Sequence, residues 1–491
     1  MKRFDYLSVI LYDMGMVFGF LGIICLVPLI VCIFFHEWAM VLPVLTAPVT
    51  FFLLSLPLSK VSVREELTPP LSVTMVSVAL SWFVLAVVGA LPFVFGLAMP
   101  FTESVFEAMS GWTGSGFTMI ASPDSIPKSL LFWRSFTQWI GGIGIIAFGI
   151  SLRRKTHLTL FRLYRSEGRP EEMVPGPAST GRKMWLIYLF LTFFFTGVVM
   201  LAGIPAWDSV NLVMVALATG GLCLHDGGLA YYNNPLLELT LIPVMLAGAF
   251  PFKLYFLMYH GKIMALFRDQ AVRVILLIAA LGSAIISFDL YIFGSVSAEQ
   301  AMREGIFCAV SAITTSGLQN SNPHQWATVP IAIITLMVVI GGSIGSAAGG
   351  IKVNRVVLAY EGIRWWFRRF FVSSRVLVPL RFEGRTLSKE ISDLEISRNM
   401  LVIVVYIITI SSATILALHL YITTFRLEEV VFEIASALSN SGISTGYISA
   451  ASPVLIKWIF IFLMWLGRLE IVALLILILG LVKGFEATMT Q

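Results

Sequence analysis

The sequence predicts an all-helical polytopic membrane protein, with two N-terminal spans followed by four similar units arranged around a central pore. Hydrophobic residues make up 58% of the chain and charged residues 12%, a balance that requires lipid to cover part of the surface. Apolar stretches long enough to cross about 30 Å of hydrocarbon recur along the chain. One sequence pattern also occurs four times along the chain, which indicates a repeated structural unit.

Apolar windows of roughly 20 residues predict ten membrane spans. They lie at 11–35, 39–59, 71–97, 129–151, 183–204, 237–258, 272–295, 328–350, 399–424 and 455–483. The first window is longer than the core of a signal peptide and lacks a small-residue cleavage site, so we expect it to be retained.

Basic residues predict the orientation of these spans. Lys and Arg gather in 152–183, in 352–398, around 262–273 and at 60–64, whereas the loops on the opposite side are nearly free of them. Cytoplasmic loops carry the excess of Lys and Arg, so both termini are expected in the cytoplasm. An even number of spans agrees with that orientation. The basic residues sit in loops and not on one face, which argues against a nucleic-acid partner.

Four semi-apolar segments on the outer side are too short to cross the membrane, and we interpret them as re-entrant loops. They lie at 102–117, 207–222, 302–318 and 427–443. When they are overlaid, a glycine falls at the same place in each, after a small residue and before a bulky apolar one. The predicted division is a prefix at 1–66, pore units at 67–160, 161–265, 266–365 and 399–491, and a cytoplasmic or interfacial linker at 366–398.

The repeated glycines predict a cation-selectivity filter. The first part of each segment is expected to be helical, and four helix C-termini facing one axis favour a cation there. Glycine then lets the backbone aim carbonyl oxygens at the axis, where they can replace the hydration shell of potassium. The alternative is close helix packing by Ser-Gly pairs, but a fourfold repeat at one register argues against it. The filter residues are Gly114, Ser115, Gly116, Thr219, Gly220, Gly221, Thr315, Ser316, Gly317, Asn440, Ser441 and Gly442, with K⁺ expected at the carbonyls of Ser115, Gly220, Ser316 and Ser441.

The segment 341–350 is half glycine and predicts a gate. A continuous helix would cost about 1 kcal/mol per glycine relative to alanine, so we expect a flexible intramembrane loop below the filter that can occlude the pore. The alternative is a helix-packing face with glycine at every fourth position. The residues concerned are Gly341, Gly342, Gly345, Gly349 and Gly350.

Two basic residues within apolar segments are further gate candidates. Arg468 lies in the last span, where an arginine is costly and usually faces a water-filled cavity or an acid. We expect it beneath the filter, holding the gating loop through its carbonyls; the alternative is a structural ion pair, although Glu470 is too close in sequence to face it on a helix. Lys253 follows a Pro break and could equally snorkel to the interface. Asp124, His225 and Asp226 could either concentrate cations at the outer mouth or cap helices.

These residues together resemble the Trk/Ktr/HKT cation transporter superfamily, and within it the TrkH-type potassium uptake subunits. Besides the four filter segments, the resemblance rests on 138–144, His225–Asp226, 341–352 and 467–470. It implies potassium as the transported ion, because all four filter positions are glycine, and no cofactor in this chain. It also implies a bacterial inner (plasma) membrane location, a homodimer with one pore in each protomer, and a separate cytosolic nucleotide-binding ring of the TrkA kind.

The favoured function is therefore channel-like potassium uptake. The alternative is a K⁺ symporter with alternating access, coupled to H⁺ or Na⁺. Carriers of that kind are often built from inverted repeats with broken helices, whereas these repeats run in one orientation. An intramembrane enzyme would need a nucleophile–base pair or a metal cluster, and the six His residues form no recognisable motif.

Overall fold

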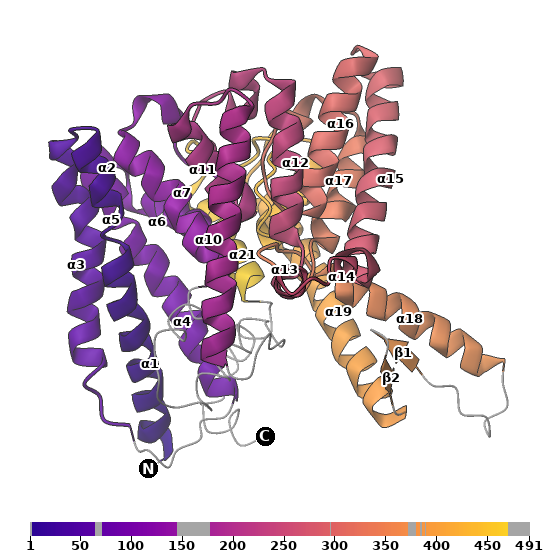
Figure 1. Cartoon of the computed structure of the whole chain (residues 1–491), viewed down its shortest axis with the longest axis horizontal. Coiled ribbons are helices and arrows are strands. Elements are labelled where there is room, and N and C mark those ends of the chain that lie inside the picture. Colours follow the sequence, from indigo (N-terminus) through magenta and orange to yellow (C-terminus); the bar gives the residue numbers. More distant parts are fainter. Residues whose placement is uncertain are drawn as a thin grey trace.

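The computed structural model describes residues 2–63, 71–144, 177–294, 296–371, 380–382, 385–387 and 389–469. Long helices stand side by side, and shorter helices dip in from the upper edge between them (Figure 1). Within the described residues, six helical segments are long and apolar enough to cross a membrane, and a bent helix pair makes a seventh candidate. The predicted fold class, a polytopic helical membrane protein, is confirmed.

The N-terminal prefix consists of α1 (Lys2–Ile24), α2 (Pro28–Phe34), a short 3-10 helix (Trp38–Met40) and α3 (Val41–Leu58). Its two spans pack closely, and the Ser55 hydroxyl donates to the carbonyl of Gly15 at 2.7 Å. The turn between them is tied to the first unit, because Glu37 accepts from the amides of Lys128 and Ser129 at 2.8 and 2.9 Å. A carboxylate at the start of a helix satisfies free N–H groups and complements the helix dipole.

Each of the four units contains an outer span, a short helix and a returning helix. Unit 1 has α4 (Leu71–Gly89) with α5 (Leu91–Leu97), then α6 (Phe101–Thr113) and α7 (Lys128–Ile143). Unit 2 has α10 (Pro177–Leu201), α11 (Ala206–Leu217), and α12 (Pro235–Ala249) with α13 (Phe252–Tyr259). After α14 (Met264–Arg268), unit 3 has α15 (Gln270–Phe293), α16 (Ala298–Ile313) and α17 (Thr328–Ile340), and unit 4 has α19 (Lys389–Leu420), α20 (Leu427–Leu438) and α21 (Val454–Arg468). The short helices α6, α11, α16 and α20 coincide with the predicted re-entrant segments.

The returning helices differ most from the predicted spans. Helices α12 and α13 are bent by 99° at a break, where Pro251 cannot continue the helix. Helix α17 ends at Ile340, well before the predicted end at residue 350, because the chain enters the glycine-rich segment. The predicted parts 145–151 and 470–483 lie outside the described residues. Irregular backbone such as that at Pro251 and after Ile340 is tolerated in a membrane protein where it is buried in protein or lines a cavity.

The predicted linker contains regular structure. Helix α18 (Val353–Phe370) runs into it and is followed by an antiparallel hairpin of β1 (Leu380–Phe382) and β2 (Arg385–Leu387), with α19 already beginning at Lys389. Figure 1 shows α18 projecting sideways from the lower edge of the helix bundle. This hairpin departs from the otherwise helical expectation.

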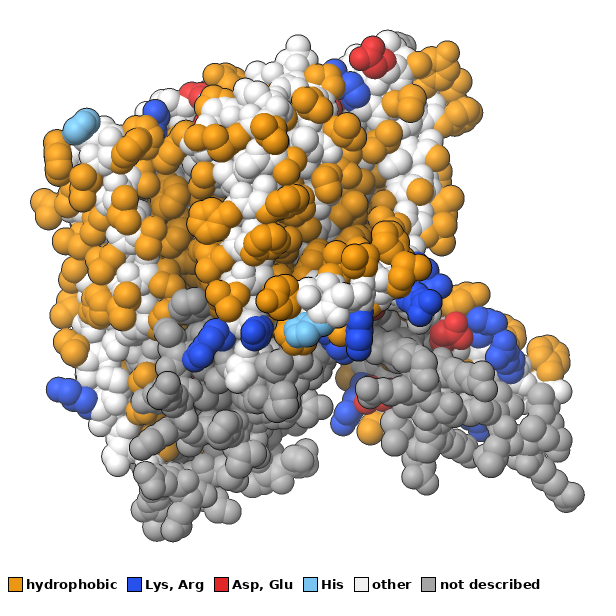
Figure 2. Space-filling model, in the orientation of Figure 1, with side chains coloured by type: hydrophobic (Ala, Val, Ile, Leu, Met, Phe, Trp, Pro, Cys, Tyr) orange, Lys and Arg blue, Asp and Glu red, His pale blue; other side chains and the backbone are white. Residues whose placement is uncertain are grey.

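The surface agrees with a lipid environment. Large apolar side chains such as Phe193 and Leu201 are exposed, at 75% and 87%, a pattern that marks a membrane-facing surface. Figure 2 shows a broad hydrophobic band across the upright helices, with most Lys and Arg of this face below it. The chain is therefore a multi-pass membrane protein with its basic residues gathered toward one edge.

Candidate cation pathway

All four short helices end in the same backbone turn. In each unit the amide of the small residue before the filter glycine donates to a carbonyl five residues back: Ser115 to Ser110, Gly220 to Val215, Ser316 to Ser311 and Ser441 to Ser436, at 2.9 to 3.0 Å. This bond, with a left-handed residue just before it, defines the Schellman ending of a helix. The aligned glycines predict this turn at the same position of all four segments, and the backbone forms it in each of them.

Two left-handed residues flank this turn in every unit. The second is the filter glycine, with φ of 77° at Gly116, 84° at Gly221, 74° at Gly317 and 84° at Gly442. The first is Gly114, Thr219, Thr315 or Asn440, with φ of 72°, 54°, 51° and 50°. Side chains seldom adopt this conformation, so three units carry a backbone strain that the first avoids with glycine.

The four filter glycines meet in a closed ring. A β-carbon built on Gly116 would lie 3.1 Å from the Cα atoms of both Gly221 and Gly442. One on Gly221 would lie 2.8 Å from the Cα of Gly317, and one on Gly317 would overlap the carbonyl oxygen of Ser441. β-Carbons built on Gly116 and Gly442 would likewise overlap the carbonyl oxygens of Gly220 and Ser115. A side chain at any of the four positions would therefore force the ring apart.

Three of the predicted ion-binding carbonyls lie at this ring. The carbonyl oxygens of Ser115, Gly220 and Ser441 each lie against the glycine of a neighbouring unit. The carbonyl oxygen of Gly220 also accepts a hydrogen bond from the Gln138 side chain at 2.6 Å. A carbonyl oxygen has two lone pairs, so one lone pair of Gly220 is not used by this bond. The ring thus brings the C-terminal ends of four helices and a set of backbone carbonyls to one point, which favours a cation.

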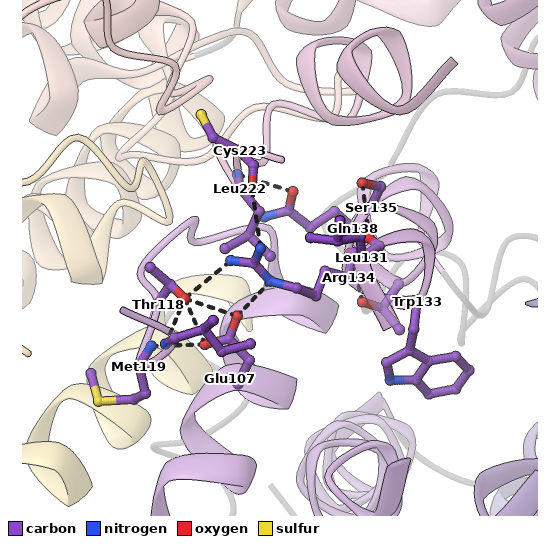
Figure 3. A network of polar contacts seen from close by, with 12 residues as sticks. Glu107, Thr118, Met119, Leu131, Trp133, Arg134, Ser135, Gln138, Leu222 and Cys223 are labelled. Atoms are coloured by element: carbon purple, nitrogen blue, oxygen red, sulfur yellow. Dashed lines mark hydrogen bonds and ion pairs between the residues drawn. The ribbon is translucent and has the colours of Figure 1, made fainter. Parts of the chain in front are cut away.

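Buried polar side chains brace the chain behind the ring. Glu107 in α6 accepts from the Met119 amide and the Thr118 hydroxyl and pairs with Arg134 of α7 at 2.8 Å. Figure 3 shows Glu107, Thr118 and the Cys223 carbonyl converging on the guanidinium of Arg134. In unit 4, Glu433 accepts in the same way from Thr445 and Ser444. These carboxylates satisfy the extended backbone that follows the filter.

The glycine-rich segment is an irregular loop directly beneath the filter. Its Gly349 amide donates to the Thr315 hydroxyl at 2.7 Å, and its Gly350 amide to the Ser439 carbonyl at 3.1 Å. On the other side, the amides of Ser343 and Ala347 donate to carbonyls at the α12 break. Gly341, Gly345 and Gly350 have φ of 69°, 77° and 78°, which excludes the alternative of a continuous helix with a packing face. Gly342, the fifth of these glycines, lies against Ala249 and Ala348.

Arg468 ends α21 close to this loop. Its guanidinium donates to the Ala347 carbonyl at 3.5 Å and to the Gly142 carbonyl at 3.3 Å, and it also contacts Gly141. It stands over the Trp82 ring at 5.2 Å from the centroid. The predicted contact between Arg468 and the loop carbonyls is therefore present, while Glu470 lies outside the described residues. Lys253 is the second residue of α13, next to the break after α12 to which the loop is hydrogen-bonded.

The loops that follow the filter turns of units 1 and 2 carry a compact polar cluster. His225 lies 2.5 Å from Asp124 and 3.5 Å from Asp208, through its two ring nitrogens. Its ring stacks on Tyr231 at 3.7 Å. Asp226 accepts from the Ser122 hydroxyl and the Asp124 amide. Asp124 and Asp226 thus join two loops to each other, while the nearby carboxylates keep this face electronegative.

Some of these residues are not among the site residues predicted from the sequence. Glu107, Arg134 and Glu433 lie in apolar segments where charge is expensive, and that cost was a usable signal for them. Gln138 stood out only within a family motif, because its partners on Gly220 and Leu222 are remote in sequence. Thr219 and Thr315 were predicted as filter residues, but no sequence signal marked their left-handed backbone.

By class, this is a helical membrane protein in which four repeated units meet at a ring of glycines. The family model described as "Cation transport protein", TrkH, matches residues 44–482, so the chain belongs to the TrkH family and the predicted resemblance is confirmed. It is 28% identical to an uncharacterized cation transporter of Methanocaldococcus jannaschii, over 95% of this chain and 94% of that one. It is 29% identical to the Trk system potassium uptake protein TrkH of Escherichia coli K12, over 82% and 83%.

The fold also matches a solved structure. The crystal structure of the potassium transporter TrkH from Vibrio parahaemolyticus superposes with a TM-score of 0.82 at 25% identity, over 96% of this chain and 98% of that one. Because the family consists of cation transporters, the chain is a transporter and not an enzyme.

Proposed function

We propose that this chain takes up potassium, conducting K⁺ through the ring of Gly116, Gly221, Gly317 and Gly442. The observation that carries the proposal is the fourfold helix ending, which brings four helix C-termini and the adjacent carbonyls to one closed ring. Carbonyl oxygens at such a ring can replace the hydration shell of K⁺. Relatives named as potassium uptake proteins align along most of the chain, which supports the same ion.

The test is cation flux into liposomes that contain the purified protein. The wild type should pass K⁺ in preference to Na⁺. Gly116→Ser should reduce that preference, because a side chain at residue 116 would meet the Gly220 carbonyl and push the first two filter loops apart. The matched control is Gly197→Ala in α10, where a β-carbon meets nothing within 4 Å. Unchanged K⁺ preference in Gly116→Ser would count against the filter.

We propose further that loop 341–350 and Arg468 form the gate. The loop is hydrogen-bonded to Thr315 and Ser439 at the underside of the filter, where it would obstruct an ion. Arg468 adds a positive charge beside the loop, which opposes a passing cation. Lys253, at the foot of the α12 break, is included in this gate as a second charge.

A coupled K⁺ symporter with alternating access is the second candidate, because the α12–α13 pair is broken in the way that carriers often show. An imposed proton or sodium gradient should drive K⁺ accumulation against its own gradient if this candidate is correct. Channel-like conduction predicts that K⁺ only equilibrates with the membrane potential.

The setting of this activity is also a proposal. We place the protein in the inner (plasma) membrane with both termini in the cytoplasm, on the edge where Lys and Arg gather (Figure 2). The proposed assembly is a homodimer that docks a cytosolic nucleotide-binding ring of the TrkA kind.

A further inference from the structure

A buried ion pair stands behind the first filter loop. Glu107 and Arg134 are 1% and 2% exposed, and the Arg134 Nε lies 2.8 Å from a Glu107 carboxylate oxygen. A second guanidinium nitrogen donates to the Thr118 hydroxyl at 3.0 Å. Since Thr118 follows the filter glycine Gly116 by two residues, the pair fixes the position of the chain just beyond the first filter turn (Figure 3).

The same helix reaches across to the second filter loop. The remaining nitrogen of Arg134 donates to the carbonyl of Cys223 at 3.0 Å. One turn further along α7, Gln138 donates to the Gly220 carbonyl at 2.6 Å and accepts from the Leu222 amide at 3.3 Å. Residues four apart share one face of a helix, so Arg134 and Gln138 together grip the second loop on both sides of Gly221.

Unit 4 lacks this arrangement although it has the same brace. Glu433 stands nine residues before Gly442, as Glu107 stands nine before Gly116. The residues at the places of Arg134 and Gln138, counted in the same way, are Phe460 and Met464. Phe460 packs on the rings of Phe117 and Tyr447. The fold of a pore unit therefore does not require an arginine and a glutamine at these places.

We propose that Arg134 and Gln138 are positioning residues that determine cation specificity, by setting the distance between the filter loops of units 1 and 2. The inference rests on the proposed potassium function of the ring. A ring of carbonyls discriminates between K⁺ and Na⁺ through its size and through the number and field of its oxygens. Any increase in the gap between the loops at Gly116 and Gly221 changes both properties, whereas the other edges of the ring keep their own contacts.

The test is the ratio of K⁺ to Na⁺ flux in liposomes for Arg134→Gln, Arg134→Lys and Gln138→Met. Arg134→Lys keeps the charge opposite Glu107 but cannot reach Thr118 and Cys223 at the same time. Gln138→Met introduces the side chain that unit 4 carries at the matching place. The control is Arg303→Gln, which breaks an ion pair of the same 2.8 Å length with Glu238, between α16 and α12 and away from the ring.

We expect the K⁺/Na⁺ ratio to fall by roughly tenfold to a hundredfold in Arg134→Gln and Gln138→Met, the scale on which a misplacement of about 1 Å acts at a positioned site. Arg134→Lys should recover part of the ratio, and Arg303→Gln should leave it at the wild-type value. A role in folding alone would lower the yield or the melting temperature in detergent and leave the ratio unchanged.

Two failures are distinguishable. If the wild type prefers K⁺ and the folded variants keep that preference, the positioning role is overturned while the potassium function stands. If the wild type passes no K⁺, the proposed function falls and this inference falls with it. Should the Arg134 variants fail to fold, Gln138→Met decides alone, and an unchanged ratio in that variant overturns the inference.

Discussion

Thr219 and Thr315 occupy the same left-handed position in neighbouring units, with φ of 54° and 51°, yet their side chains have different surroundings. Thr315 accepts from the Gly349 amide of the loop at 2.7 Å, whereas Thr219 packs near Gly248 at the α12 break. A single hydroxyl in unit 3 therefore links the filter to the loop beneath it. This bond and the bond from the Gly350 amide to the Ser439 carbonyl hold the loop against the filter.

Thr315→Val should raise K⁺ flux several-fold. Valine keeps the shape of threonine but leaves the Gly349 amide without its acceptor, a loss of about 1 kcal/mol or more that the loop recovers by leaving the filter. Such a change shifts an equilibrium by roughly fivefold. Flux would be measured in liposomes at fixed membrane potential. Thr219→Val is the matched control, and an equal rise there would mean that the loop is not involved.

Asp124 gives the outer loops a defined dependence on pH. Hydrogen bonds from the Asp226 amide and then from His225 hold the pKa of Asp124 below its ordinary value. The folded protein thus binds this proton less tightly than the unfolded chain. The resulting stability is complete above the ordinary aspartate pKa of about 3.9 and is lost as the pH falls through the lowered value.

The corresponding measurement compares the melting temperatures of wild type and Asp124→Asn in detergent between pH 7 and pH 3. The wild type should melt higher by a constant margin at pH 5 to 7, and the margin should shrink toward pH 3. A margin that grows on acidification would contradict the lowered pKa of Asp124.

At the scale of single elements, the loop after α17 is hydrogen-bonded to residues of three of the four units. It is bonded to the α12 break, to the filter of unit 3 and to Ser439 in unit 4, and Arg468 contacts its Ala347 carbonyl. A segment with so many hydrogen bonds holds one defined position, while its left-handed glycines allow others. Those two properties together are what a gate requires.

Arg468→Ala should raise K⁺ flux several-fold and leave the K⁺/Na⁺ ratio unchanged. The substitution removes a positive charge beside the pathway and one anchor of the loop, but it touches no filter residue. Arg468→Lys separates the two effects, because lysine keeps the charge without a guanidinium that spans Ala347 and Gly142. A fall in flux, or a shift of the ratio in Arg468→Ala, would show that this arginine supports the filter instead of the gate.

The elements that the sequence could predict are those with local causes. Apolar length predicts the spans, and a glycine after a short helix predicts the turn that ends it, so Gly116, Gly221, Gly317 and Gly442 could be located. The 99° bend between α12 and α13 depends on what packs around it. The contact of Gln138 with Gly220 depends on how units 1 and 2 pack together, and a single sequence does not reveal that packing.

On the scale of the whole molecule, the basic edge and the proposed gate lie at the same end. The irregular loop lies on the inner side of the filter if the basic edge in Figure 2 faces the cytoplasm, and the cluster of Asp124, His225 and Asp226 then faces outward. A cation entering from outside would meet carboxylates first, the glycine ring next and Arg468 last. That order suits uptake, because attraction acts at entry and control acts at the exit.

This orientation can be tested with cysteines placed at opposite ends of the molecule. Lys262→Cys lies between α13 and α14, and Ser125→Cys lies between α6 and α7; both positions are exposed. A membrane-impermeant maleimide added to intact cells should label Ser125→Cys, while Lys262→Cys should react only after the cells are opened. The native Cys25, Cys32 and Cys308 are buried and Cys223 is half-buried, so the unsubstituted protein gives the background. Labelling of Lys262→Cys in intact cells would reverse the orientation and place the loop and Arg468 at the outer mouth.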